Sequence, residues 1–77
     1  MTSSADIPEV EIDGDMIRLG QFLKFADLIE SGGEGKEAIA EGLVAVNGEI
    51  EVRRGRQLHD GDIVDLDDRT VRVRLLG

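Results

Sequence analysis

Apolar residues along this chain repeat with two different periods, and the change between them separates a helical part from a strand-forming part. In the helical part an apolar stripe recurs at i, i+3, i+4 and i+7, which is one face of an amphipathic helix. The stripe consists of Leu19, Phe22, Leu23 and Ala26. We therefore predict a first helix from about Arg18 to Ala26, with Phe22 and Phe25 in the core and Lys24 opposite the stripe.

A second helix is predicted directly after a break at residues 31–33, which read Ser-Gly-Gly. Ser31 is a typical N-cap, and Glu34 three residues later completes the pattern of a capping box. Gly42 stands where a helix ends on a residue with positive φ. The pattern predicts a short helix between these limits, with Lys36 in its second turn.

From Leu43 onward apolar and polar residues alternate, which is the period of β-strands. Asn47-Gly48 separates two such runs and is the strongest short signal for a tight hairpin, with Ile50 and Val52 on the return strand. Two later runs, at 63–66 and 71–75, and an edge strand at 9–13 complete the pattern. We predict an α+β fold in which two short helices pack on a small, mainly antiparallel sheet.

The chain has 77 residues, which is enough for one domain and one core but leaves little room for a substrate pocket. We expect a disordered start at residues 1–7 and a single domain at 8–77, without catalytic residues, metal site or cofactor. The chain has no cysteine, and its first residues do not resemble a signal peptide. No apolar stretch is long enough for a membrane span, so we expect a cytoplasmic protein.

The formal net charge of −8 argues against a nucleic-acid partner, but the charges are unevenly distributed. Residues 1–15 contain five acids and no base, whereas residues 52–57 contain three arginines and no acid. These arginines are Arg53, Arg54 and Arg56. A phosphate backbone responds to the local field of a patch more than to the total charge, so a basic site remains compatible with an acidic chain.

Residues 17–66 carry a specific resemblance to a known family. The matching positions are Leu23-Lys24, Leu28, Ser31, Glu34, Lys36, Ile39, the run 42–48, Arg53 to Arg56, Leu58, Gly61-Asp62 and Val64. In these positions the chain resembles the small RNA-binding domain named after ribosomal protein S-four, most closely its stand-alone bacterial, YbcJ-like branch. The resemblance implies a helix-helix-hairpin motif that holds structured RNA, commonly ribosomal or transfer RNA, through its phosphates.

The resemblance and the helix start together give a set of candidate RNA-binding residues. The set comprises Lys24, Ser31, Gly32, Gly33, Lys36, Asn47, Gly48, Arg53, Arg54 and Arg56. At the start of the second helix, free N–H groups and glycines would let a phosphate approach the main chain. The chain departs from the family where Gly32 replaces a common Arg, Gly35 a common Ala and Gly20 a frequent acid.

Other interpretations of the same features remain open. The arginines could form an ordinary solvated loop, and Asn47-Gly48 serves the turn first. We expect Phe22 and Phe25 to be core residues and not a platform on which bases stack. A ubiquitin-like sulfur carrier or another protein-interaction module is an alternative. Sulfur carriers need a Gly-Gly tail and begin with a hairpin before their helix. This chain ends in a single glycine, and two predicted helices precede its main strands. The acidic face of the protein could also bind a larger ribosome-associated protein. We expect neither a membrane nor a small molecule as a partner.

Overall fold

The computed structural model describes residues 7–77 of the chain. Its elements are β1 (Glu9–Ile12), β2 (Ile17–Arg18), α1 (Leu19–Phe25), α2 (Gly32–Ala40), β3 (Val44–Val46), β4 (Glu49–Ile50), β5 (Gln57–Leu58), β6 (Ile63–Leu66) and β7 (Arg69–Leu75). Two helices and several strands form a small α+β fold, as predicted. Of the expected disordered start, residues 1–6 lie outside the described part. Neither helix in that part is long and apolar enough to cross a membrane.

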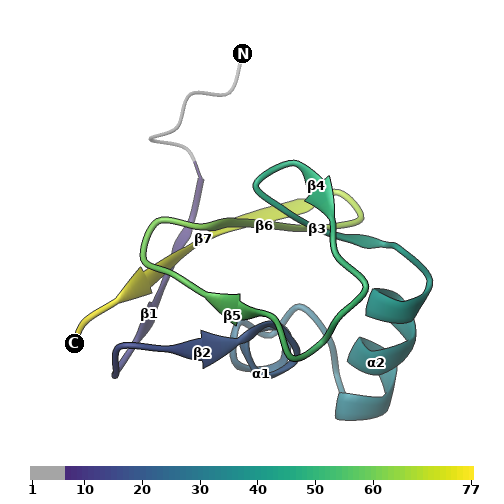
Figure 1. The fold of residues 1–77 in the computed structure, drawn as a ribbon, viewed down its shortest axis with the longest axis horizontal. Coiled ribbons are helices and arrows are strands. Elements are labelled where there is room, and N and C mark those ends of the chain that lie inside the picture. The colour runs from purple at the N-terminus through teal and green to yellow at the C-terminus, as the bar shows by residue number, and fades with distance from the viewer. Residues whose placement is uncertain (1–6) are drawn as a thin grey trace.

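Five strands form one sheet in the order β1-β7-β6-β3-β4 (Figure 1). All neighbours in this sheet are antiparallel except β1 and β7, which run parallel. The predicted edge strand near Val10 is therefore real, and its partner is the last strand of the chain. Strands β2 and β5 pair separately as a short antiparallel ribbon that the alternation pattern did not predict.

The hairpin between β3 and β4 depends on the backbone of its two turn residues. Asn47 and Gly48 both have positive φ, at 53° and 85°, which is the requirement of the tight turn that the dipeptide predicted. The Asn47 amide also ties this turn to β6: its Oδ1 accepts from Ile63 N at 2.9 Å, and its Nδ2 donates to Asp62 Oδ1 at 3.1 Å. The return strand ends at Ile50, and the exposed Val52 lies outside it.

The start of α2 follows the predicted N-cap, but of the predicted capping box only the hydrogen bond to the serine side chain is formed among the described residues. Ser31 is the N-cap in an extended conformation, and its Oγ accepts a hydrogen bond from Glu34 N at 3.2 Å. The helix ends before Gly42, whose φ of 77° lets the chain turn into β3. Both ends of α2 therefore lie where the sequence pattern predicted them.

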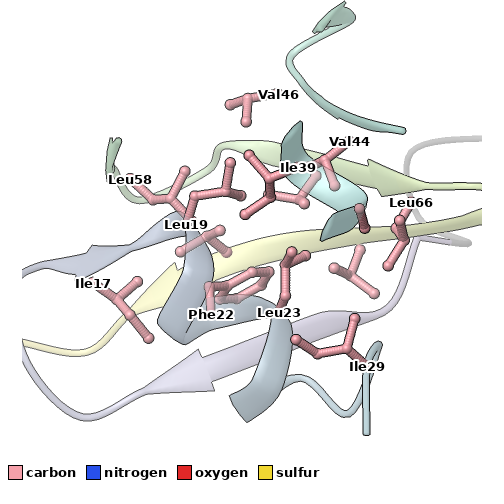
Figure 2. Close-up of a cluster of buried hydrophobic side chains, with 14 of the residues drawn as sticks. Ile17, Leu19, Phe22, Leu23, Ile29, Ile39, Val44, Val46, Leu58 and Leu66 are labelled. Carbon is pink, nitrogen blue, oxygen red and sulfur yellow. The ribbon is translucent and has the colours of Figure 1, made fainter. Parts of the chain in front are cut away.

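The core lies between the two helices and the sheet. Its largest fully buried side chains come from α1, α2, β3, β5, β6 and β7: Phe22, Leu19, Leu23, Ile39, Leu58, Val44, Val46, Val64 and Val73. In Figure 2, Phe22 and Leu23 of α1 lie in one cluster with Ile39 of α2 and Val44 of β3. This contact fixes both helices against the sheet, and with them the surfaces that they present to solvent.

The prediction that both phenylalanines are core residues was wrong for Phe25. Phe22 is fully buried, whereas Phe25 is 61% exposed at the last position of α1. The helix ends at Phe25, with Ala26 as its C-cap. The apolar stripe at 19, 22, 23 and 26 occupies the buried face, so Phe25 falls on its flank, toward solvent.

Candidate nucleic-acid interface

A groove of about 400 Å³ lies between α1, the second turn of α2 and the loop that follows β4. We call it the cationic groove; its lining consists of Arg18, Gly20, Gln21, Lys24, Gly35, Lys36, Arg54 and Gly55. Four of these side chains are positively charged and none is acidic. Within residues 7–77, none of the four makes an ion pair with a carboxylate, so their charges are available to a ligand.

The other basic side chains of the described part are engaged elsewhere. Arg72 and Arg74 on β7 both lie near Glu9 on β1, with N–O distances of 3.8 and 3.9 Å. Arg69 donates to the Asp27 carbonyl at 3.3 Å. Five Lys and Arg side chains of the described part make no ion pair with a carboxylate; four of them lie in the cationic groove, and the fifth is Arg69.

Main-chain hydrogen bonds hold the loop 51–56 against the start of α1. The first N–H groups of a helix have no partner inside the helix, and here two of them find carbonyls of the loop. Leu19 N donates to Arg56 O at 2.8 Å, and Gly20 N donates to Arg54 O at 2.9 Å. Arg18 Nη1 donates to Gly55 O at 2.8 Å. The loop therefore caps α1, and this contact brings Arg54 to the groove.

Gly20 lies directly beside the loop. A Cβ at this position would lie 3.4 Å from both the Cβ and the carbonyl oxygen of Arg54, at the lower limit of an ordinary van der Waals contact. An acidic residue is frequent here in the family that the sequence resembles, and it would also place a carboxylate in the groove. With glycine at this position, the lining of the groove contains no negative charge.

The interior of the loop is organised by one carboxylate, that of Glu51. Glu51 is only 5% exposed. Its carboxylate accepts hydrogen bonds from Arg53 Nε at 3.1 Å, Arg53 Nη2 at 3.2 Å and Arg56 Nη1 at 3.0 Å. The backbone N–H of Arg53 donates to it as well, at 3.1 Å. Arg53 and Arg56 thus share the carboxylate of Glu51, which directly precedes the run 52–57 without acids. Of the three loop arginines, only Arg54 lines the cationic groove.

Hydrogen bonds from Arg53 and Arg56 lower the pKa of Glu51 from an ordinary 4.5 to about 2. Because folding lowers this pKa, the ionised carboxylate stabilises the protein fully above about pH 4.5, and this contribution is lost as the pH falls toward 2. We expect Glu51→Gln to be less stable than the wild type at neutral pH, with a difference that shrinks below pH 4.5. Urea denaturation followed by far-UV circular dichroism at a series of pH values measures this.

The exposed Glu49 on β4 offers a matched control for this experiment. Glu49→Gln removes the same charge two residues away, and we expect it to leave the free energy of unfolding at neutral pH near that of the wild type. A stability difference between wild type and Glu51→Gln that stays constant from neutral to acid pH would contradict the role assigned to Glu51.

Of the candidate residues from the sequence, three meet in the cationic groove: Lys24, Lys36 and Arg54. They come from α1, α2 and the loop, so their proximity is a product of the tertiary fold. Arg18 is a fourth cation that sequence reasoning missed. Its side chain contacts Gly55, which is 37 positions away in the sequence, and local sequence patterns do not predict contacts between residues so far apart.

The remaining candidates lie outside the lining of this groove or at its border. Ser31 and Gly33 form the start of α2, where the serine hydroxyl is already engaged by Glu34 N. Gly32 is the first residue of that helix. Asn47 and Gly48 form the β3–β4 turn, and the Asn47 amide is held by β6. None of these five residues lines the cationic groove.

A second groove, of about 430 Å³, lies on the other flank of α2. We call it the acidic groove; its acidic lining residues are Glu34, Glu37, Glu41, Asp67 and Asp68, with Arg69 as the one base. The three glutamates recur at i, i+3 and i+7 and so share one flank of α2, whereas Lys36 projects from the opposite one. Helix α2 therefore separates an attractive from a repulsive surface for any polyanion.

The described residues contain no cluster of three or more His, Asp or Glu side chains that could hold a metal ion. Because four of its lining side chains are basic and none is acidic, the cationic groove is suited to the binding of anions. Guanidinium groups form paired hydrogen bonds with phosphate oxygens, and lysine ammonium groups act as point charges.

Comparisons with known proteins agree with this geometry. The probable ribosome maturation protein RlbA of Bacillus subtilis (strain 168) is 52% identical to this chain over 58 residues, which cover 75% of this chain and 82% of the relative. Residues 10–74 match the family described as the S4 domain, a span that includes both helices, the loop 51–56 and all four groove cations. The chain therefore belongs to the S4 domain family.

Proposed function

We propose that this protein is a non-catalytic RNA-binding module that holds structured RNA, of the ribosomal or transfer RNA class, through phosphate and shape contacts. The observation that carries the proposal is the cationic groove, where four basic side chains without carboxylate partners converge in a molecule of net charge −8. The order α1, α2, β3–β4 supports a helix-helix-hairpin RNA-binding motif at residues 8–77. An A-form helix presents phosphates and 2′-hydroxyls that such a groove can follow with little base readout.

The residues of the candidate set would contribute to RNA binding in different ways. Lys24, Lys36 and Arg54, joined by Arg18, would contact phosphates directly. Arg53 would add a weaker contact, because its guanidinium holds Glu51 yet remains largely exposed. The glycines at 32 and 33 would admit a phosphate to the start of α2, where Glu34 in the first turn opposes it. Asn47 and Gly48 would act chiefly by fixing the hairpin.

The description of the relative RlbA supports a more specific role for this chain. RlbA is described as a probable ribosome maturation protein, and it shares half of its aligned residues with this chain. We propose that this chain acts on ribosomal RNA in the cytoplasm during the same kind of process. We further propose that its acidic groove faces a basic, ribosome-associated protein, because its five acids repel phosphates and attract the opposite charge.

Filter binding of the wild-type protein to ribosomal and transfer RNA at several salt concentrations tests the proposal. We expect micromolar or tighter binding at low salt, with a slope of log affinity against log salt of about −3, because four cations would neutralise about four phosphates. Absence of binding at low salt would remove the proposal. Binding to both RNA classes with equal affinity would limit recognition to backbone and shape.

The sulfur-carrier alternative receives no support from the arrangement of the first strands. Carriers of that kind begin with a hairpin before their helix. Here β1 pairs with β7 and β2 pairs with β5, so the two strands before α1 do not pair with each other. Intact mass after incubation with a sulfur-activating enzyme distinguishes the two functions, and we expect no sulfur to be added at Gly77.

The structural role of Asn47 leads to a stability prediction. Asn47→Gly retains a residue that adopts positive φ but removes both side-chain hydrogen bonds, and we expect it to lower the free energy of unfolding by about 1 to 2 kcal/mol. Asn47→Ala adds the cost of a left-handed alanine, about 1 kcal/mol more. Urea denaturation of both variants measures the difference. Equal stability of Asn47→Ala and the wild type would contradict this role.

A further inference from the structure

Among residues 7–77, Phe25 is the only aromatic side chain that lies outside the hydrophobic core. The chain has two aromatic residues; Phe22 is fully buried, whereas Phe25 is 61% exposed. A single exposed apolar side chain is ordinary on a protein surface, so its exposure alone assigns no role. What distinguishes Phe25 is the surface to which it belongs.

Phe25 continues one wall of the cationic groove. It follows Gln21 by four residues on α1, and residues four apart lie one above the other on the same side of a helix. Gln21 lines the groove, so the backbone of Phe25 lies about one helical turn, roughly 6 Å along the helix axis, beyond that of Gln21. Its sequence neighbour Lys24 also lines the groove, and α1 contains no acidic residue.

The charge around this ring favours a nucleobase over a protein side chain as its partner. A partner that reaches Phe25 from the groove must be compatible with the unpaired charges of Arg18, Lys24 and Arg54, and polyanionic RNA meets that condition. Sequence-tolerant recognition of unpaired nucleotides combines such a charged track with an aromatic face on which a base stacks. Bases inside a duplex already stack on each other and are not available.

We propose that Phe25 stacks on an unpaired nucleobase of the RNA whose phosphates occupy the cationic groove, an inference that rests on the proposed RNA-binding function. The RNA class that this surface takes is then a helix with an adjoining loop, bulge or single-stranded end. The groove contacts the backbone and supplies affinity, and the ring selects RNA with at least one unstacked base next to it.

Fluorescence anisotropy with two labelled RNAs tests the inference: a stem-loop with a uridine loop, and the blunt duplex of the same stem. We expect Phe25→Ala to weaken stem-loop binding roughly five- to a hundredfold. Binding of the duplex should not change. The salt dependence of stem-loop binding should also keep its slope, because the substitution removes no charge.

A reporter variant gives an independent readout, because the chain has no tryptophan or tyrosine. We expect the fluorescence of Phe25→Trp to be quenched when the stem-loop binds and to be unchanged by the duplex. Leu43→Trp is the matched control: Leu43 is also exposed, at 47%, but lies in the acidic groove, where no RNA is expected.

The outcomes separate this inference from the function on which it rests. Salt-dependent binding of the wild type with unchanged stem-loop affinity in Phe25→Ala would overturn the stacking role and leave RNA binding intact. Equal weakening for stem-loop and duplex would overturn it as well, because the contact would not depend on an unpaired base. A wild-type protein that binds neither RNA at low salt would overturn both.

Discussion

Arg54→Glu will weaken binding to structured RNA roughly tenfold to a hundredfold at low salt, whereas Arg74→Glu will change it little. The two substitutions make the same change in net charge, on side chains that are both accessible to solvent. Arg54 lines the cationic groove without a carboxylate partner, and its reversal also places a negative charge beside Lys24 and Arg18. Arg74 lies on β7 near Glu9 and outside the groove.

The double variant Lys36→Glu/Arg54→Glu provides the stronger form of this prediction. Two of the four groove cations are then gone, so the slope of log affinity against log salt should fall in magnitude from about 3 to roughly 1.5. Filter binding over a salt series measures both affinity and slope, and far-UV circular dichroism shows whether each variant is folded. Equal losses for Arg54→Glu and Arg74→Glu would mean that total charge, rather than this groove, governs binding.

Local signals in the sequence were sufficient for the local parts of this fold. The cap at Ser31, the turn at Asn47-Gly48 and the stop at Gly42 each depend on neighbouring residues, and the structure confirms all three. The β2–β5 ribbon and the parallel pairing of β1 with β7 join segments far apart in the chain. Two-residue strands carry too few positions for a period to be recognised, so no pattern could predict that ribbon.

The candidate site shows the same limit more sharply. In the sequence Arg53, Arg54 and Arg56 form one basic run, and no local signal indicates which of them is free to bind a ligand. In the fold Glu51, two residues before the run, engages the first and the last, and the carbonyls of Arg54 and Arg56 cap α1. Whether an arginine in such a loop is free depends on side-chain directions set by these contacts. Of the three arginines, only Arg54 lines the cationic groove, and RNA binding by any of the candidate residues stays a prediction.

The two phenylalanines provide the prediction with the largest expected effect on stability. Phe22→Ala will lower the free energy of unfolding by about 3 to 5 kcal/mol, because it leaves a cavity between α1, α2 and the sheet. A domain of this size has roughly 4 to 12 kcal/mol in total, so this variant will be marginal or unfolded. Phe25→Ala, three residues along the same helix, will change it by no more than about 0.5 kcal/mol.

Urea and thermal denaturation followed by far-UV circular dichroism measure both variants without a tryptophan signal. We expect the melting temperature of Phe22→Ala to fall by about 12 °C or more and that of Phe25→Ala to stay near the wild-type value. A side chain that contributes little to folding but much to stem-loop binding would be placed for a ligand. If Phe25→Ala were destabilised as strongly as Phe22→Ala, the ring would belong to the core after all, and its availability to a nucleobase would be excluded.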